Sequence, residues 1–113
     1  MHELSLAENV RGIIEDAARE QGFSRVRTVW LEIGQLSCVE REAMHFCFDA
    51  AMQDSVAAGA RLEIVETPGR GKCTQCGHEA QIATLYEPCP QCGSYAMQVT
   101  AGDAMRVTEL EVE

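Results

Sequence analysis

Aromatic residues, positive charge and long apolar runs are all scarce in this chain. Of its 113 residues only one is Trp, two are Tyr and three are Phe, although 46% are hydrophobic. We therefore expect a core of Val, Ile, Leu, Ala and Met, in one ordinary domain or in a small domain that carries a metal-stabilised insert. No apolar run approaches the roughly 18 residues of a membrane span. The first residues also lack the basic-then-apolar pattern of a signal peptide, so we expect no membrane segment and a cytoplasmic location.

Positive charge is half as frequent as negative charge. The chain has 9 Lys and Arg against 18 Asp and Glu, which gives a formal net charge of −9. A surface of this charge repels phosphate backbones and anionic lipids, so neither nucleic acid nor a membrane is an expected partner. It suits cations, or a partner protein that carries a basic patch.

Four of the six cysteines form two Cys-x-x-Cys pairs. Cys73 and Cys76 are followed by the twelve residues 77–88, and then by Cys89 and Cys92. Each pair can aim two sulfurs at one point, and two pairs supply the tetrahedral four-sulfur set that Zn²⁺ prefers. Four thiolates leave no position for a substrate, so the predicted zinc site is structural. Gly77 and Gly93, one after each pair, favour the positive φ of such a turn.

The alternatives to zinc are two disulfides or a redox Cys-x-x-Cys. Redox motifs usually occur singly, at the start of a helix in a βαβ unit, and none is visible here. His78 follows Cys76 by two residues and is expected to face solvent. Cys38 and Cys47 lack this spacing and are expected to be thiols in the core.

Hydrophobic periodicity predicts two helices and three strands around the cysteine segment. The first helix spans residues 4–21, with an apolar stripe of Leu6, Val10, Ile13, Ile14 and Ala17. The second spans roughly 38–53 and opens on a capping box from Ser37 to Glu40. Its stripe consists of Val39, Ala43, Phe46, Cys47, Ala50 and Ala51, with His45 on the solvent side. Strands are expected over residues 25–33, 61–67 and 105–112, with a further short strand within 80–86.

The order of these elements predicts an α/β (α+β) fold. It consists of a three-stranded sheet with two helices, interrupted before the last strand by an inserted zinc-ribbon-like module. We expect an α/β domain of residues 1–69 and 97–113 and a zinc domain of residues 70–96.

Met1, His2 and Glu3 form a second candidate metal site. A free α-amine, the His2 amide nitrogen and the His2 imidazole can close adjacent chelate rings on one metal ion, and the Glu3 amide or carboxylate can add a donor. Such nitrogen-rich, nearly planar sets suit Ni(II) or Cu(II) better than zinc. A histidine after the first methionine also occurs by chance, and the alternative is an ordinary solvated terminus.

Several motifs together resemble the HypA/HybF family of nickel-insertion accessory proteins, which mature [NiFe]-hydrogenase. They are Met-His-Glu-Leu-Ser-Leu at 1–6, Val-Trp-Leu-Glu-Ile-Gly-Gln-Leu-Ser-Cys-Val-Glu at 29–40, the four paired cysteines and a Glu-Val-Glu ending. The resemblance covers essentially the whole chain.

This resemblance implies a metallochaperone rather than an enzyme, with Ni(II) as cargo and one structural zinc. It implies a nickel site at His2, with backbone nitrogens from Met1 and Glu3, and zinc ligands at Cys73, Cys76, Cys89 and Cys92. Some longer relatives have an extra histidine between the cysteine pairs that approaches nickel, but here the loop offers only His78.

The implied partners are a HypB-type GTPase and a hydrogenase large-subunit precursor. The chain has no P-loop, so a nucleotide-driven step has to come from a partner. Two other functions were weighed. A nucleic-acid-binding zinc ribbon would need a basic patch, and a zinc enzyme would need an open coordination position and a general base. The sequence leaves the oligomeric state open, a homodimer included.

Overall fold

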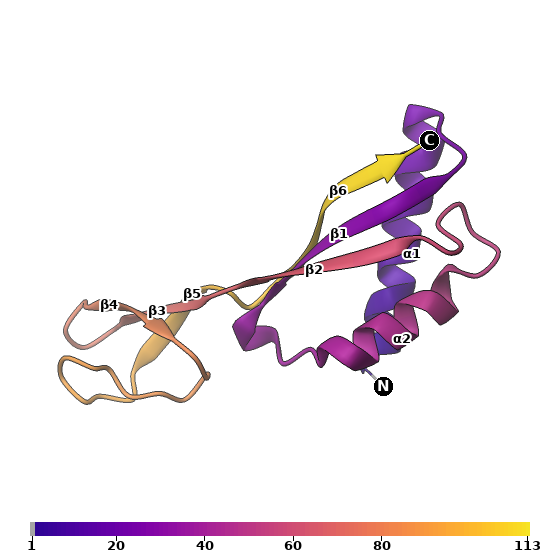
Figure 1. The fold of residues 1–113 in the computed structure, drawn as a ribbon. Coiled ribbons are helices and arrows are strands. Elements are labelled where there is room, and N and C mark those ends of the chain that lie inside the picture. Colours follow the sequence, from indigo (N-terminus) through magenta and orange to yellow (C-terminus); the bar gives the residue numbers. More distant parts are fainter. Residues whose placement is uncertain (1) are drawn as a thin grey trace. The chain divides into compact units, whose positions relative to one another are not determined.

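The computed structural model describes residues 2–113, in two helices, a short 3-10 turn and six strands (Figure 1). Met1 lies outside the described residues. The elements are α1 (His2–Gln21), β1 (Val26–Gly34), η1 (Gln35–Ser37), α2 (Arg41–Met52), β2 (Arg61–Thr67), β3 (Gly69–Cys73), β4 (Glu79–Ile82), β5 (Met97–Ala101) and β6 (Met105–Val112). Neither helix within residues 2–113 has the length and apolarity that a membrane crossing demands.

The strands form two three-stranded sheets, and the chain divides into two compact units. One sheet has the order β2-β1-β6 and the other the order β4-β3-β5. The first unit comprises residues 1–31, 39–65 and 106–113, and the second comprises residues 32–38 and 66–105. The predicted fold class is thus confirmed: two helices with a three-stranded sheet, and an inserted module that contains the paired cysteines. The predicted zinc-domain boundaries, 70–96, stay a prediction.

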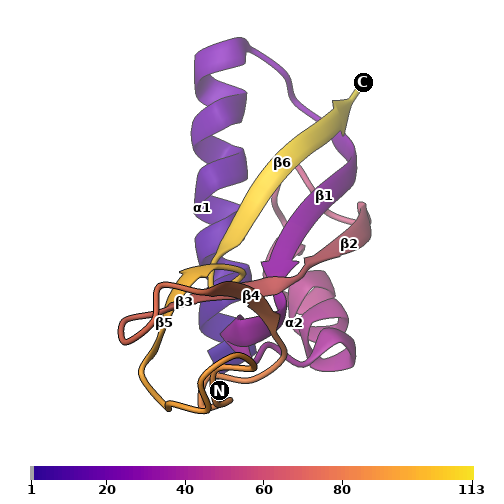
Figure 2. The ribbon, with the colours of Figure 1, turned by 90° about the vertical axis from the view of Figure 1, so that its left-hand side faces the viewer.

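The core of the first unit lies where α1, α2 and the strands meet, and Figure 2 shows α1 running alongside the sheet. Phe48, Ile14, Leu31, Met44 and Met52 are the largest side chains that this core buries. Burying one such side chain contributes about 1.5–3 kcal/mol. These few residues therefore supply much of the unit's stability without any help from aromatic clusters.

The predicted stripe of α1 is slightly rotated from the observed one. Val10 and Ile14 are buried as predicted, but Ala7 and Ala18 complete the buried row, and Ile13 is 50% exposed. The small side chains at 7 and 18 let the helix lie close to its neighbours. Ile13 is left on the surface beside β6.

The predicted start and stripe of the second helix are wrong. Ser37 does not cap it, because its hydroxyl donates to the carbonyl of Gly34, 2.7 Å away, and Cys38 takes a left-handed φ of 59° that a helix cannot contain. The helix begins at Arg41, and the Glu40 carboxylate caps it by accepting from the backbone N–H groups of residues 42 and 43.

Two apolar rows compete on α2, and the predicted row is the one with the smaller side chains. Phe46 is 77% exposed, whereas Met44, Phe48 and Met52 are almost fully buried. The observed row wins because it removes more apolar surface from water than the alanine-rich row would. Cys47 lies in the core as predicted, but Cys38 is exposed, contrary to prediction.

The second unit is built on β3, which pairs antiparallel with β4 and with β5. Gly71 lies opposite Ala80 on one side and Val99 on the other. The short strand predicted within 80–86 is observed earlier, as β4. Three glycines allow the backbone to pack closely in this unit: a Cβ on Gly34 would lie 2.1 Å from the Gly102 carbonyl oxygen, and one on Gly102 would lie 2.5 Å from the Cα of Gly69. Any larger residue at Gly34 or Gly102 would therefore force these segments apart.

Candidate metal centre

The four paired cysteines converge on one point of the second unit. Their sulfur atoms all lie within 4.8 Å of one another. The Cys73 and Cys92 sulfurs are 3.6 Å apart, and those of Cys76 and Cys89 are 3.7 Å apart. Sulfurs placed tetrahedrally at the Zn–S distance of about 2.3 Å would be separated by roughly 3.8 Å, so the cluster has the dimensions of a four-thiolate zinc site.

Disulfides do not account for this cluster. A disulfide needs about 2.05 Å between sulfurs, and all six cysteines of the chain are free. The alternative of two disulfide bonds is therefore not what the structure shows.

The two cysteine pairs have the same local geometry. The Gly77 N–H donates to the Cys73 carbonyl, and the Gly93 N–H donates to the Cys89 carbonyl, each at 2.8 Å. Both glycines have positive φ, +78° and +76°, as the sequence predicted. Because glycine adopts this conformation without steric cost, each pair folds back tightly enough to bring both of its sulfurs to one side.

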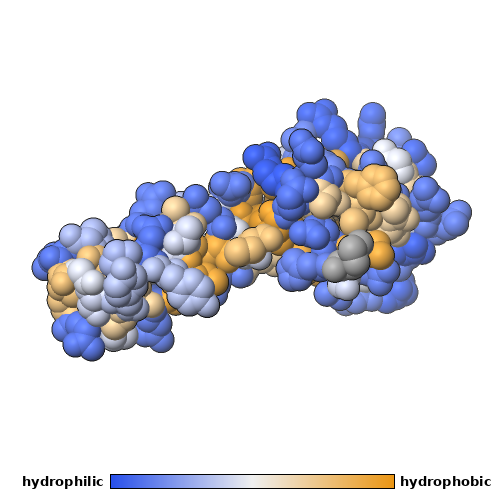
Figure 3. Space-filling model, turned by 90° about the horizontal axis from the view of Figure 1, so that it is seen from below, coloured by the Kyte–Doolittle hydropathy of each residue, from blue (hydrophilic) through white to orange (hydrophobic). Residues whose placement is uncertain are grey.

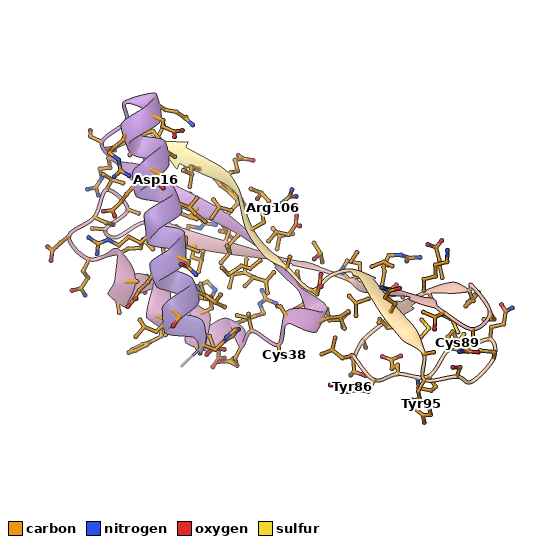
Figure 4. The ribbon with its side chains drawn as sticks, turned by 180° about the vertical axis from the view of Figure 1, so that it is seen from behind. Asp16, Cys38, Tyr86, Cys89, Tyr95 and Arg106 are labelled. Carbon is orange, nitrogen blue, oxygen red and sulfur yellow. The ribbon has the colours of Figure 1, made fainter. Side chains whose placement is uncertain are left out.

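A further backbone hydrogen bond closes each of the two turns. The Cys73 N–H donates to the His78 carbonyl at 2.9 Å, and the Cys89 N–H donates to the Ser94 carbonyl at 2.7 Å. β3 ends at Cys73 and so delivers the first pair to the cluster (Figure 4, where Cys89 marks the second pair). His78 is half-buried, and among residues 2–113 only cysteines make up this metal-binding group.

The four cysteine thiols of the cluster differ in pKa. Backbone N–H groups, above all that of Cys76, lower the pKa of Cys73 to about 7, and the N–H of Cys92 lowers the pKa of Cys89. Cys76 also accepts from a backbone N–H, that of His78, but desolvation and hydrogen bonds with the other sulfurs raise its pKa to about 12. Once one thiol ionises, its neighbours donate to it and keep their protons. Four thiolates therefore require a cation among them.

Acid should release the metal with a steep pH dependence. Zinc binds thiolates only, so each of the four cysteines takes up a proton as the ion leaves, and zinc affinity must fall as the pH falls. We expect release in the acidic range, with about four protons taken up per zinc. A chromogenic zinc indicator, read at several pH values, measures the slope. A slope of about two protons per zinc would mean that only one cysteine pair binds the ion.

The other predicted site residues lie at the start of α1. The helix begins at His2, whose side chain is exposed, and Glu3 is half-buried. The Glu3 carboxylate accepts a hydrogen bond from the Glu40 N–H at 3.2 Å. This bond, followed by that from its own backbone N–H, lowers the pKa of Glu3. The first turn of α1 is thus held against the residue that caps α2.

The contact of Glu40 with the amino end was not predicted from the sequence. The predicted role of Glu40 was the last position of a capping box, for a helix starting at residue 38. Nothing in the spacing indicates that residues 3 and 40 meet.

The first turn of α1 offers backbone nitrogens to a metal. The first four N–H groups of a helix have no partner within the helix. The amides of His2 and Glu3 therefore do not have to break a helical hydrogen bond before they ligate an ion. The structure brings Glu3 and Glu40 together at this turn.

Fold and cluster together define a small α+β protein with a zinc-ribbon-like metal site. The family model described as "Hydrogenase/urease nickel incorporation, metallochaperone, hypA" matches residues 1–112. The chain therefore belongs to the HypA family of nickel-incorporation metallochaperones, which serves hydrogenase maturation.

Individual relatives agree with this assignment. The chain is 61% identical to the hydrogenase maturation factor HypA of Albidiferax ferrireducens and 57% identical to that of Rhodopseudomonas palustris. Each match covers the whole of this chain and the whole of the relative. It is also similar to the solution structure of the Ni metallochaperone HypA from Helicobacter pylori. That match has a TM-score of 0.75 at 26% identity and covers 97% of this chain and 96% of the other.

Proposed function

We propose that this chain is a cytoplasmic nickel carrier that binds one Ni(II) at its amino end and delivers it to the large-subunit precursor of a [NiFe]-hydrogenase. The observation that carries the proposal is the family match over residues 1–112. An exposed histidine at the first position of α1 supports it, because that position has no evident role in the core.

The proposed nickel ligands are the α-amine of Met1, the amide and imidazole nitrogens of His2 and the amide nitrogen of Glu3. Four nitrogens in adjacent chelate rings favour the near-planar geometry of Ni(II). A cation at a helix N-terminus is normally disfavoured by the helix dipole. Deprotonation of two amides offsets this unfavourable interaction, because their two negative charges neutralise the two positive charges of Ni(II).

Glu3 is proposed to contribute its backbone rather than its carboxylate. That carboxylate is already hydrogen-bonded to the Glu40 N–H, and the Glu40 carboxylate is occupied in capping α2. Both acidic side chains would have to give up these bonds in order to ligate nickel.

The cysteine cluster is proposed to hold one zinc ion. Cys73, Cys76, Cys89 and Cys92 supply four soft thiolate ligands, and a closed shell of four leaves zinc a structural role, with regulation through partner binding as a further one. No step of nickel delivery needs to pass through this site.

Two partners are proposed. A HypB-type GTPase supplies the nucleotide-driven step, because the chain has no P-loop. The hydrogenase precursor accepts the nickel. The chain itself catalyses no reaction in this scheme, and a homodimer remains compatible with it.

The nickel content of the hydrogenase tests the proposed function. In cells that lack this gene, the wild-type chain should restore nickel in the purified large subunit, and His2→Gln should restore about one tenth as much or less. His45→Gln is the matched control, because His45 is an exposed histidine on α2. Full nickel content with His2→Gln, at an equal level of the chain, would refute delivery from the amino end.

A further inference from the structure

A groove with a volume of about 330 Å³ runs between α1 and β6 in the first unit. Six of its nine lining residues are apolar, and the polar groups of the lining expose as much surface as the apolar ones. Two of the lining side chains are large apolar groups that remain on the surface, Ile13 at 50% and Val112 at 43% exposed. The remaining apolar residues of the lining are Ala17, Phe23, Val107 and Leu110. A soluble chain of this size gains nothing from leaving such a row uncovered.

One wall of the groove is the free edge of a sheet. The sheet order β2-β1-β6 makes β6 an outer strand, and Figure 2 shows it between α1 and β1. The other edge of β6 is taken by β1: the Glu113 N–H donates to the Arg25 carbonyl, and the Thr28 hydroxyl donates to Glu111. Since bonding alternates along a strand, the amide of Val112, which precedes Glu113, points away from β1 and toward the groove.

The groove also has an acidic rim. Glu109 lines it, is exposed and has no ion-pair or hydrogen-bond partner among the described residues. Glu20 follows Ile13 by seven residues, which places it two turns further along the same side of α1.

Two of the nearby arginines are engaged with other carboxylates. Arg19 pairs with Asp16, and Arg25 pairs with Glu113. Arg106 lies near the start of β6 and does not line the groove. Figure 4 labels both Asp16 and Arg106. Figure 3 shows hydrophilic residues over much of the face that is seen from below.

We propose that this groove binds an extended segment of a partner protein, which adds a strand beside β6. Such strand addition takes its affinity from backbone hydrogen bonds and its specificity from alternate side chains. The apolar lining requires Val, Ile or Leu at every second position of that segment. The acidic rim requires Lys or Arg at the positions between them.

Charge favours a basic partner over a second copy of this chain. Each copy carries a net charge of −9, so two copies repel one another. Charged residues on an outer strand are a common means of preventing pairing between like strands. The proposal does not depend on the nickel site, and its test involves no nickel.

The test uses NMR on the zinc-loaded full chain. The probe is an eight-residue peptide that alternates valine and lysine, and the comparison peptide alternates valine and glutamate. We expect the lysine peptide to shift the amide signals of β6 and of Ile13 and Ala17. We also expect it to slow hydrogen exchange at Val112 by at least about tenfold, and to bind more weakly as salt is added. The glutamate peptide should leave the spectrum unchanged.

Substitutions at the rim and in the groove sharpen the test. Glu109→Lys should reverse the preference between the two peptides. Glu42→Lys, at an exposed position of α2 outside the groove, should not. Ile13→Glu should abolish binding of the lysine peptide without altering the spectrum of the free chain beyond its neighbourhood.

Three results would overturn the proposal. One is the absence of binding at millimolar peptide, and another is equal binding of both peptides. The third is a concentration-dependent shift of β6 signals without peptide, which would identify a second copy as the occupant.

Discussion

Replacing Cys89 by serine, or removing the metal with a chelator, should unfold residues 70–96 and leave most of the helix signal intact. The second unit has little core of its own: Leu36 and Ile82 are its largest buried apolar side chains outside β1. Each contributes only about 1.5–3 kcal/mol. A structural zinc ion contributes about 10–16 kcal/mol of apparent binding free energy, far more than this core.

The helices lie in the first unit and should not depend on the metal. The buried residues of α1 and α2 pack within that unit, and neither helix supplies a cysteine to the cluster. Far-UV circular dichroism should therefore lose little helix signal, while the amide signals of 70–96 collapse toward unfolded positions in the NMR spectrum.

Cys38→Ser is the matched control for this experiment. Cys38 belongs to the same unit but is exposed and outside the cluster. It should keep a full equivalent of zinc and a native spectrum. A Cys89→Ser chain with full zinc content and native amide dispersion would show that the four-cysteine assignment is wrong.

The second large effect is expected at the amino end. His2→Gln deletes the imidazole, and an N-terminal extension removes the free amine, so each should weaken nickel binding about 100-fold or more. Loss of a residue that merely supports a metal ligand already costs about 10–100-fold. Stability should change by no more than about 0.5 kcal/mol, because His2 is exposed. Calorimetric titration with nickel measures the first effect and thermal unfolding the second.

The pH dependence of nickel binding gives an independent check. Protonated imidazole cannot ligate a metal, so nickel affinity should fall as the pH falls. His45→Gln should bind nickel as the wild type does. Equal nickel affinity in wild type, His2→Gln and the extended chain would remove the amino-end site and direct attention to His45 or His78.

Local features were predictable from the sequence, because a few adjacent residues determine them. The Cys-x-x-Cys turns and their glycines required only the geometry of a tight turn, and the structure reproduces both. The last strand, 105–112, also needed no more than β-rich composition after the turn at 101–103.

Features that depend on competition between distant segments were not predictable. On α2 both Phe46 and Phe48 lie on helical rows, and only packing against the rest of the unit decides that Phe48 is buried. The Glu3 contact with Glu40 joins residues 37 positions apart. The groove beside β6 exists because β6 is an outer strand, and strand order does not follow from strand composition.

X-ray absorption at the nickel and zinc edges of one sample tests the central claim most directly. The chain is loaded with one equivalent of each metal and freed of unbound ions. We expect nickel surrounded by nitrogen and oxygen with no sulfur, and zinc retained with four sulfurs at about 2.3 Å. Sulfur neighbours at nickel, with zinc displaced into solution, would contradict the separation of cargo and structural metal on which the proposed function rests.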